Sequence, residues 1–290
     1  MSKMAEESSL VENRPSAGQI PPTQTEKPAI KFKFIKEYWL GLLCALYLFS
    51  VGFLFHKHRN LITQILRHFG FEKRARPEVR PLIPRVELSQ IIEDAVPIRI
   101  LEPVFERGSL TLIELYALNQ LIKKFNPETL FEMGTLNGRT TLNMAANCRE
   151  GAKVYTLDLP KEKIDSTRFQ IEAIERFTVE KNKSGEKYYG RPEERKITQL
   201  FGDTGTFDFS PYYGRVDFVF IDASHAYEYV VNDSEKALKL LRGGKGIIVW
   251  DDYVGSAGVT QALNEFYKTR KEFKNLRHIE GTELAYLERP

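Results

Sequence analysis

The chain is poor in cysteine. Its 290 residues include only Cys44 and Cys148, too few for the framework of a disulfide-rich protein or for a zinc site made of several thiolates. Cys44 lies in an apolar run, while Cys148 lies near the end of an expected helix, so a bridge between them is not expected. A reducing compartment fits this composition.

The chain also has little net charge and no internal repeat. Its 42 Lys and Arg against 39 Asp and Glu leave a formal charge of +3, with the positive excess before residue 81. So small an excess gives little support for nucleic-acid binding, and none is expected. Basic segments such as residues 73–76 are more typical of a membrane flank.

Residues 1–30 are rich in Pro, Ser, Glu and Gln and show no hydrophobic period. Such a segment buries too little apolar surface to offset the entropy of ordering. We therefore expect a disordered tail.

Residues 38–55 contain no charged side chain, are flanked by lysine and arginine, and begin with the aromatic pair Tyr38-Trp39. The run approaches the ~20 residues that cross a bilayer, and it predicts one transmembrane helix. A buried core helix or a hydrophobic hairpin is the alternative. The basic residues on the two sides are nearly equal in number, so they do not set an orientation.

Residues 56–103 are basic and interrupted by proline, which is typical of a linker and lead-in, and residues 104–290 have the size of one domain. Strand-like and helix-like segments alternate through this domain, which favours an α/β fold with a parallel sheet covered on both faces. The expected strands are 129–134, 153–159, 196–203, 216–223, 245–252 and a closing pair at 276–281 and 283–289. The expected helices are a first one capped by Ser109 and ended by Asn126-Pro127, then 140–148, 228–241 and 259–269.

A glycine turn, Glu132-Met-Gly134-Thr-Leu-Asn-Gly138, follows the first of these strands. Gly134 and Gly138 allow a tight turn and a close approach of the backbone to a ligand, and the next helix offers free N–H groups. The spacing is neither the GxGxxG dinucleotide fingerprint nor a phosphate loop. A purely structural turn is the alternative.

The next two strands end in carboxylates. Asp158 follows the turn by about 20 residues, where an acidic side chain can accept both hydroxyls of a ribose. Asp203, after Gly202, is placed to meet the exocyclic amine of a base. Each is also an ordinary loop residue when taken alone, but together they indicate a nucleoside-containing ligand.

These residues resemble the class I S-adenosylmethionine-dependent methyltransferases over about residues 109–290. The resemblance is carried by Glu132-x-Gly134-x-x-x-Gly138, by Asp158 and by Gly202-Asp203. It implies a Rossmann-like sheet of seven mostly parallel strands ending in an antiparallel hairpin. It also implies that the glycine turn meets the methionine part of the cofactor, that Asp158 holds the ribose, and that Asp203 lies near adenine.

Three further aspartates lie at the ends of the later strands: Asp222 in 216–223, and Asp251-Asp252 in 245–252. Neighbouring strands would bring them together, and carboxylate oxygens are the ligands that Mg²⁺ prefers. A helix cap at Asp222 and a solvated turn at Asp251-Asp252 are the alternatives.

The pattern Asp222-x-x-His225 with Asp251-Asp252 is similar to the metal-dependent O-methyltransferases, especially those acting on sugar hydroxyls of natural products. The resemblance implies that the three aspartates hold magnesium and that His225 is the base. The related catechol enzymes typically use a lysine base and an asparagine ligand, which this sequence lacks.

The sequence thus predicts a membrane-tethered methyltransferase, with its domain on the cytoplasmic face, that uses S-adenosylmethionine and magnesium on a small-molecule or glycosyl hydroxyl. An inactive, membrane-anchored scaffold protein and a nicotinamide-dependent oxidoreductase are the rival hypotheses. The charged insertion at 161–196 is either a lid, with Tyr188 and Tyr189 as acceptor contacts, or a solvated excursion.

Overall fold

The computed structural model describes residues 32–55, 58–59, 61–62, 79–92, 94–106, 108–171, 173–181 and 183–290. The chain divides into two compact units, one up to Lys73 and one from Arg74 to Pro290. The predicted disordered tail at 1–30 lies outside the described residues.

The first unit contains the helix α1 (Phe32–Ser50) and the short 3-10 helix η1 (Gly52–Leu54). The apolar run at 38–55 is therefore not one helix, because α1 ends at Ser50, whose hydroxyl donates to the Leu46 carbonyl at 2.6 Å. In addition, α1 includes the charged residues Lys36 and Glu37. None of the described helices combines the length and the apolar composition needed to span a membrane, so the predicted transmembrane helix is not found.

The second unit is built on one sheet, whose eight described strands run in the order β1-β7-β8-β6-β5-β2-β3-β4. All pairs are parallel except β6–β8 and β7–β8, as expected for a closing hairpin. The prediction of seven strands missed β1, which adds two residues beside β7. The strands are β1 (Arg85–Val86), β2 (Thr129–Met133), β3 (Lys153–Asp158), β4 (Ile197–Phe201), β5 (Phe218–Ile221), β6 (Gly246–Trp250), β7 (Arg277–Ile279) and β8 (Ala285–Arg289).

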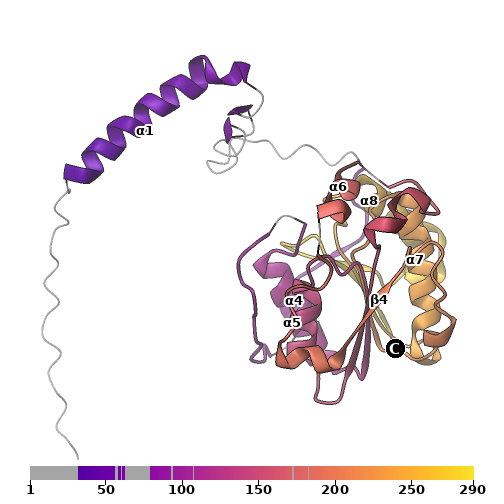
Figure 1. The fold of residues 1–290 in the computed structure, drawn as a ribbon. Helices are drawn as coiled ribbons and strands as arrows, with labels where there is room; N and C mark the ends of the chain where they lie inside the picture. The colour runs from indigo at the N-terminus through magenta and orange to yellow at the C-terminus, as the bar shows by residue number, and fades with distance from the viewer. Residues whose placement is uncertain are drawn as a thin grey trace, which may run out of the picture. The chain divides into compact units, whose positions relative to one another are not determined.

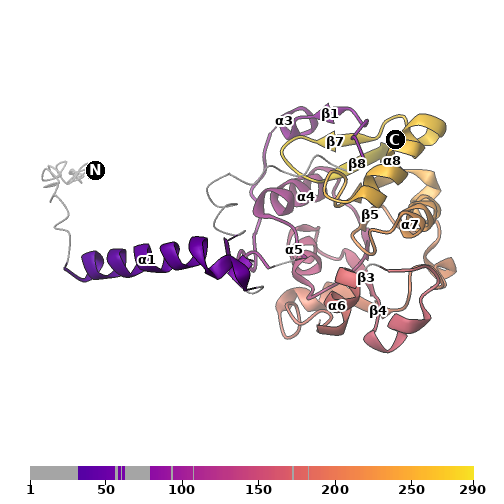
Figure 2. The same ribbon diagram turned by 90° about the horizontal axis from the view of Figure 1, so that it is seen from above.

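Helices cover both faces of this sheet, with α4 and α5 on one side and α7 and α8 on the other (Figures 1 and 2). Successive side chains of a strand point to opposite faces. In β2, accordingly, Leu130 joins the core under α4 and α5, and Phe131 joins the core under α7 and α8. The helices are α3 (Leu88–Ile91), α4 (Leu112–Phe125), α5 (Arg139–Asn147), α6 (Ala173–Lys181), α7 (Tyr227–Leu240) and α8 (Ala257–Thr269), with short 3-10 turns η2 (Lys161–Ser166), η3 (Pro192–Lys196), η4 (Ser210–Tyr212), η5 (Arg242–Gly244) and η6 (Lys271–Phe273).

The lead-in to the domain differs from its prediction as a linker. Residues 79–103 belong to the second unit and contain β1 and α3. The backbone amides of Leu82 and Ile83 both donate to the buried Tyr253 hydroxyl at 2.9 Å. The first helix is likewise capped by Thr111, not Ser109, because Thr111 and Glu114 form a reciprocal capping box.

The strand order reverses between β2 and β5. From β2 the chain moves outward through β3 and β4, then returns to place β5 on the other side of β2. In the parallel register Met133 is the partner of Ile221, so the residues after these two strands, Gly134 and Asp222, emerge side by side. Ligands of open α/β sheets bind at such a switch point, beyond the carboxyl ends of the strands.

Candidate active site

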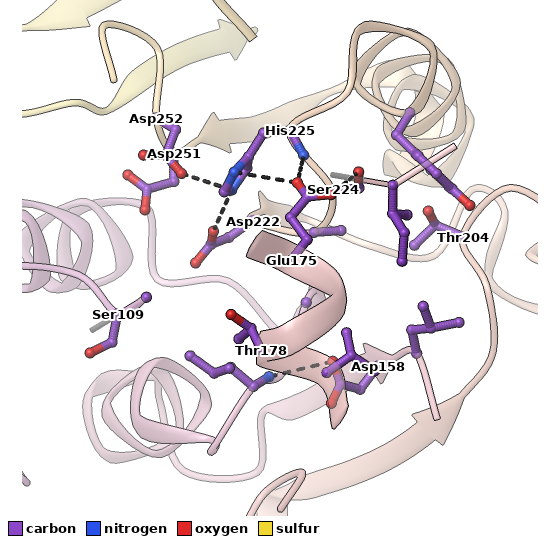
Figure 3. Close-up of a pocket in the computed structure, with 18 of the residues that line it drawn as sticks. Ser109, Asp158, Glu175, Thr178, Thr204, Asp222, Ser224, His225, Asp251 and Asp252 are labelled. Atoms are coloured by element: carbon purple, nitrogen blue, oxygen red, sulfur yellow. Dashed lines mark hydrogen bonds and ion pairs between the residues drawn. The ribbon is translucent and has the colours of Figure 1, made fainter. Parts of the chain in front are cut away.

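A cavity of about 460 Å³ lies at this switch point. Its volume is in the range of roughly 300–1,000 Å³ that is typical of small-molecule sites. The residues that follow β2, β3, β4, β5 and β6 all contribute to its wall, together with α6 and the segment before α4. Asp158 and Thr204 lie at one part of the wall, and Asp222, His225, Asp251 and Asp252 at another (Figure 3).

Gly134 is the residue that brings these two parts together. Its backbone has φ +98°, a conformation that favours glycine, and an added Cβ would lie 1.9 Å from the Asp222 carbonyl oxygen. The Asp222 amide in turn donates to the Met133 carbonyl at 2.8 Å. The turn after β2 and the end of β5 are therefore in direct backbone contact, which a side chain at 134 would prevent.

Asp158 lines the cavity at the end of β3, next to the glycine turn. One carboxylate oxygen lies 3.3 Å from the Thr135 amide and 3.4 Å from the Leu136 amide, and the Ser184 hydroxyl donates to the other at 2.6 Å. Burial raises the pKa of this carboxyl, although these donors oppose the shift. Asp158 is thus fixed in orientation at the wall.

Asp203 also lies at the cavity wall, but the protein already supplies its partners. One oxygen accepts from the Gly205 amide at 2.9 Å and from the Tyr229 hydroxyl at 2.7 Å, and the other accepts from the Arg168 amide at 2.8 Å. The residue is only 5% exposed. This geometry shows Asp203 organising the turn after β4.

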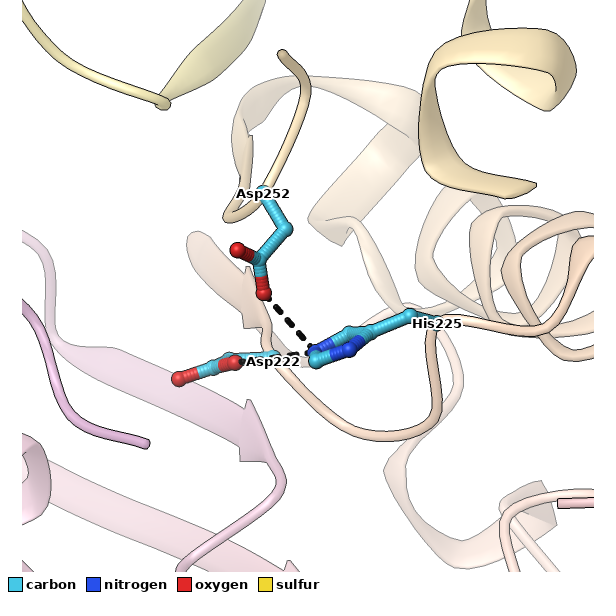
Figure 4. A group of neighbouring side chains, drawn as sticks. All are labelled: Asp222, His225 and Asp252. Carbon is cyan, nitrogen blue, oxygen red and sulfur yellow. Dashed lines mark ion pairs between the residues drawn. The ribbon is translucent and has the colours of Figure 1, made fainter. Parts of the chain in front are cut away.

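Asp222, His225 and Asp252 form a compact group whose potential ligand atoms all lie within 4.8 Å of one another (Figure 4). His225 Nε2 lies 2.8 Å from an Asp252 oxygen and 3.9 Å from an Asp222 oxygen. Asp252 has φ +58°, so a left-handed turn directs it differently from its neighbour Asp251. Asp251, the third aspartate predicted to hold magnesium, lines the cavity but lies outside this group.

The charges of this group are strongly coupled. Burial favours a neutral His225, but hydrogen bonding and charge from Asp222 and Asp252 outweigh it and raise the pKa of the imidazole to about 11. Burial raises the pKa of Asp222 to about 6, and burial with the charges of Asp222 and Asp252 raises the pKa of Asp251 well above its usual value. Burial opposes ionisation of Asp252, yet the hydrogen bond from His225 lowers its pKa. In this arrangement His225 is a proton donor, so it becomes a base only when another cation neutralises the carboxylates.

Residues 131–253 match a protein family described as a methyltransferase domain. The chain contains a methyltransferase domain. The match begins in β2 and ends just after β6, so it includes the glycine turn, Asp158 and the acidic group. The resemblance to a methyltransferase that was drawn from the sequence is therefore confirmed.

Solved structures similar to this chain include three methyltransferases. An O-methyltransferase from Streptomyces achromogenes involved in tomaymycin synthesis, in complex with SAM, is 14% identical, with a TM-score of 0.44 over 66% of this chain and 93% of that one. An O-methyltransferase from Bacillus cereus in complex with SAH is 18% identical, with a TM-score of 0.40 over 79% and 97%. A methyltransferase from Podospora anserina with SAH bound is 16% identical, with a TM-score of 0.42 over 63% and 81%. No curated protein matches the chain.

Two of the five residues predicted to bind the cofactor of the methyltransferase domain, Glu132 and Gly138, do not line the cavity. Glu132 is fully buried and accepts hydrogen bonds from the hydroxyls of Thr141 and Thr156. An added Cβ at Gly138 would lie 2.7 Å from the Tyr188 ring. Both residues thus pack against the protein next to the glycine turn, whereas Gly134, Asp158 and Asp203 line the cavity.

The insertion of the methyltransferase domain is partly a wall of the cavity. Its helix α6 contributes Glu175, Thr178 and Val179 to the wall. These three residues were not predicted from the sequence, although the helix-forming residues around them indicate a helix in this segment. Tyr188 and Tyr189, the predicted acceptor contacts, do not line the cavity. Tyr188 is 1% exposed and donates its hydroxyl to Gln199.

Arg139 is another residue whose role was not predicted from the sequence. It directly follows the glycine turn, is 1% exposed, and donates to the carbonyls of Glu102 and Leu110 at 2.6 Å each. The segment between those two carbonyls supplies Phe105 and Ser109 to the cavity wall. Arg139 therefore ties this wall to the methyltransferase core.

Burial of Glu132 makes the stability of the methyltransferase domain depend on pH. Desolvation raises the pKa of Glu132 to about 8 from a usual 4.5. The folded state therefore favours the protonated acid, so the free energy of unfolding falls as pH rises from about 4.5 to about 8. Glu132→Gln mimics the protonated form. We expect this variant to lack the decrease in the free energy of unfolding, on the order of a few kcal/mol, that ionisation of Glu132 causes as pH rises.

Urea unfolding at pH 5 and at pH 8 measures this effect. Glu132→Gln should be more stable relative to the unsubstituted chain at pH 8 than at pH 5, whereas the exposed control Glu186→Gln should show no such difference. A glutamine variant with the pH dependence of the unsubstituted chain would contradict the assignment.

Proposed function

We propose that this chain transfers a methyl group from S-adenosylmethionine to a hydroxyl oxygen of a small-molecule or glycosyl acceptor, assisted by Mg²⁺. The observation that carries the proposal is that a single cavity of the methyltransferase domain joins Asp158 to the group formed by Asp222, His225 and Asp252. The part of the cavity at Asp158 suits a nucleoside, and the part at Asp222, His225 and Asp252 suits a cation together with an acceptor hydroxyl. Because both parts belong to one cavity, a methyl group can pass from one bound ligand to the other.

The part of the cavity at Gly134 and Asp158, where the methyl donor would bind, fits S-adenosylmethionine in its backbone shape and in its charge. At Gly134 the backbone borders the cavity without a side chain, where the methionine part would lie, and Asp158 is placed to accept the ribose hydroxyls. Among the described residues that line the cavity there is no lysine or arginine. A wall that carries several carboxylates and no lysine or arginine favours a cationic ligand, and the sulfonium of this donor supplies the reactive methyl group.

The acceptor end fits a hard divalent cation. Asp222 and Asp252 offer oxygen atoms, which Mg²⁺ prefers while keeping several waters. Such an ion, when bound, lowers the pKa of an acceptor hydroxyl and supplies the positive charge that the carboxylates now take from protonated His225. With that charge in place, His225 would release its proton to solvent and could then accept the proton of the acceptor hydroxyl.

The rate enhancement then comes mainly from orientation. The wall formed by the residues after β2, β3 and β5 holds donor and acceptor so that oxygen, methyl carbon and sulfur are in line, which removes much of the entropic barrier. The same wall limits the acceptor. Since no described lysine or arginine borders the cavity, we propose an acceptor without anionic groups.

Calorimetry on the full chain tests the donor assignment. We expect binding of S-adenosylmethionine and none of NAD, with affinity lowered roughly 10- to 100-fold in Asp158→Ala because charged hydrogen bonds to the ribose are lost. Asp165→Ala removes a carboxylate that is 79% exposed on the insertion after β3, and this variant should bind like the unsubstituted chain. Failure of the full chain to bind the methyl donor would overturn the assignment.

A transfer assay with isotope-labelled donor tests the role of the cation. With a neutral acceptor that carries vicinal hydroxyls, we expect a chelator to stop methyl transfer and added Mg²⁺ to restore it. Transfer that continues at an unchanged rate in the chelator would contradict a role for magnesium, without affecting the donor assignment.

A further inference from the structure

The helix α6 borders the cavity between its two parts. Glu175, Thr178 and Val179 of this helix all line the wall, and Figure 3 shows Glu175 near His225 with Thr178 between the acidic group and Asp158. The helix comes from the charged insertion at 161–196, whose described residues contribute no strand to the sheet. Its contacts with the site therefore call for a functional explanation.

Glu175 makes the direct contacts between α6 and the loop that carries His225. Its Oε1 accepts the backbone N–H of His225 at 2.6 Å, and its Oε2 accepts the hydroxyl of Ser224 at 2.9 Å. Oε1 also lies 3.4 Å from Nδ1 of the His225 ring. Only 11% of the Glu175 side chain is exposed, so these hydrogen bonds are shielded from water and well defined.

The loop is held at Asp222 by the Met133 carbonyl and lies against Gly258 of α8 at His225, and Glu175 is the side chain that accepts its backbone N–H at His225. The loop runs from Asp222 at the end of β5 to Tyr227 at the start of α7, and the residue before α7, Ala226, provides no side-chain cap. The other nitrogen of the His225 ring, Nε2, lies 2.8 Å from an Asp252 oxygen. Displacing the loop would displace the ring from the acceptor site.

We propose that Glu175 is a positioning residue, which acts through the His225 amide and the Ser224 hydroxyl to hold the His225 ring against the acceptor. The proposal assumes the methyl transfer described above. The proposal gives the insertion a specific role. The sheet places His225 on a loop, and Glu175 of the insertion then fixes the orientation of the His225 ring.

Two substitutions separate hydrogen bonding from charge. Glu175→Gln retains one oxygen to accept the His225 amide, and its NH₂ group can donate to the Ser224 hydroxyl after that hydroxyl rotates. Glu175→Ala removes both contacts. If positioning is the role, the glutamine variant keeps most of the function and the alanine variant loses it.

Steady-state kinetics provide the first test. For Glu175→Ala we expect kcat to fall on the order of 10²-fold through misplacement of the reacting groups, with KM for S-adenosylmethionine little changed. Glu175→Gln should restore most of kcat. Glu180→Gln, which removes a half-exposed carboxylate of the same helix, should behave like the unsubstituted chain. An unchanged kcat in Glu175→Ala, or an equal loss in the glutamine variant, would overturn the proposal.

Amide hydrogen exchange provides a test that needs no activity. The full chain has five histidines, so labelling with ¹⁵N-histidine gives few amide signals, and His225→Asn identifies the one of interest. We expect its exchange to be roughly five- to tenfold faster in Glu175→Ala and unchanged in Glu175→Gln. Equal exchange in all variants would refute the contact itself. Faster exchange without methyl transfer to any acceptor would leave the contact standing and reject the proposed function.

Discussion

Gly134→Ala is expected to lower the free energy of unfolding by roughly 3–5 kcal/mol. The backbone at Gly134 has φ +98°, and the new Cβ would lie 1.9 Å from the Asp222 carbonyl oxygen and 2.5 Å from its carbon. Both obstacles are backbone atoms at the centre of the sheet, so no side chain can rotate away to relieve the clash. Chemical denaturation followed by far-ultraviolet circular dichroism measures the loss.

Gly151→Ala is the matched control. Gly151 also has positive φ, at +80°, but a Cβ added there would have no atom within 4 Å. Only the conformational strain of about 1–2 kcal/mol applies there. Equal losses at positions 134 and 151 would show that the close approach of β2 and β5 contributes nothing.

His225→Ala is expected to lower kcat for methyl transfer roughly 10²- to 10⁴-fold, the usual contribution of a general base. The affinity for a divalent cation should remain nearly the same, because Asp222 and Asp252 supply the oxygen ligands. Titration with Mn²⁺ measures that affinity on the same samples. Asp252→Asn should instead weaken cation binding together with the rate.

The opposite result has a clear meaning. If His225→Ala loses cation affinity in proportion to its loss of rate, the imidazole is a ligand and another group takes the proton. The distance of 2.8 Å between His225 Nε2 and Asp252 makes this a real alternative, which the paired measurement decides.

Much of the architecture follows from local patterns in the sequence. The seven predicted strands all occur, and their ends place Gly134, Asp158 and Asp222 at one edge of the sheet. This succeeds because hydrophobic period and chain direction are local properties, and parallel strands bring their carboxyl ends together. The short β1 carries too little pattern for detection, since it forms only through its pairing with β7.

The helix caps and the apolar run show where local patterns mislead. Thr111 and Glu114 have the three-residue spacing of a capping box, which can be recognised in the sequence. The cap was nevertheless predicted at Ser109. The uncharged run at 38–55 has the composition of a span, but composition does not fix where a helix ends, and α1 stops at Ser50.

At the site, the residue types and their places at strand ends can be read along the chain, whereas the contacts between them depend on the fold. The sequence determined that carboxylates and one histidine end neighbouring strands, because residue type and strand end are local. Tertiary structure decided that Asp252, not Asp251, meets His225, that Glu132 is buried below the cavity, and that Glu175 reaches in from the insertion. Each of these depends on a left-handed turn or on contacts between distant segments, and such contacts leave no periodic signal in the chain.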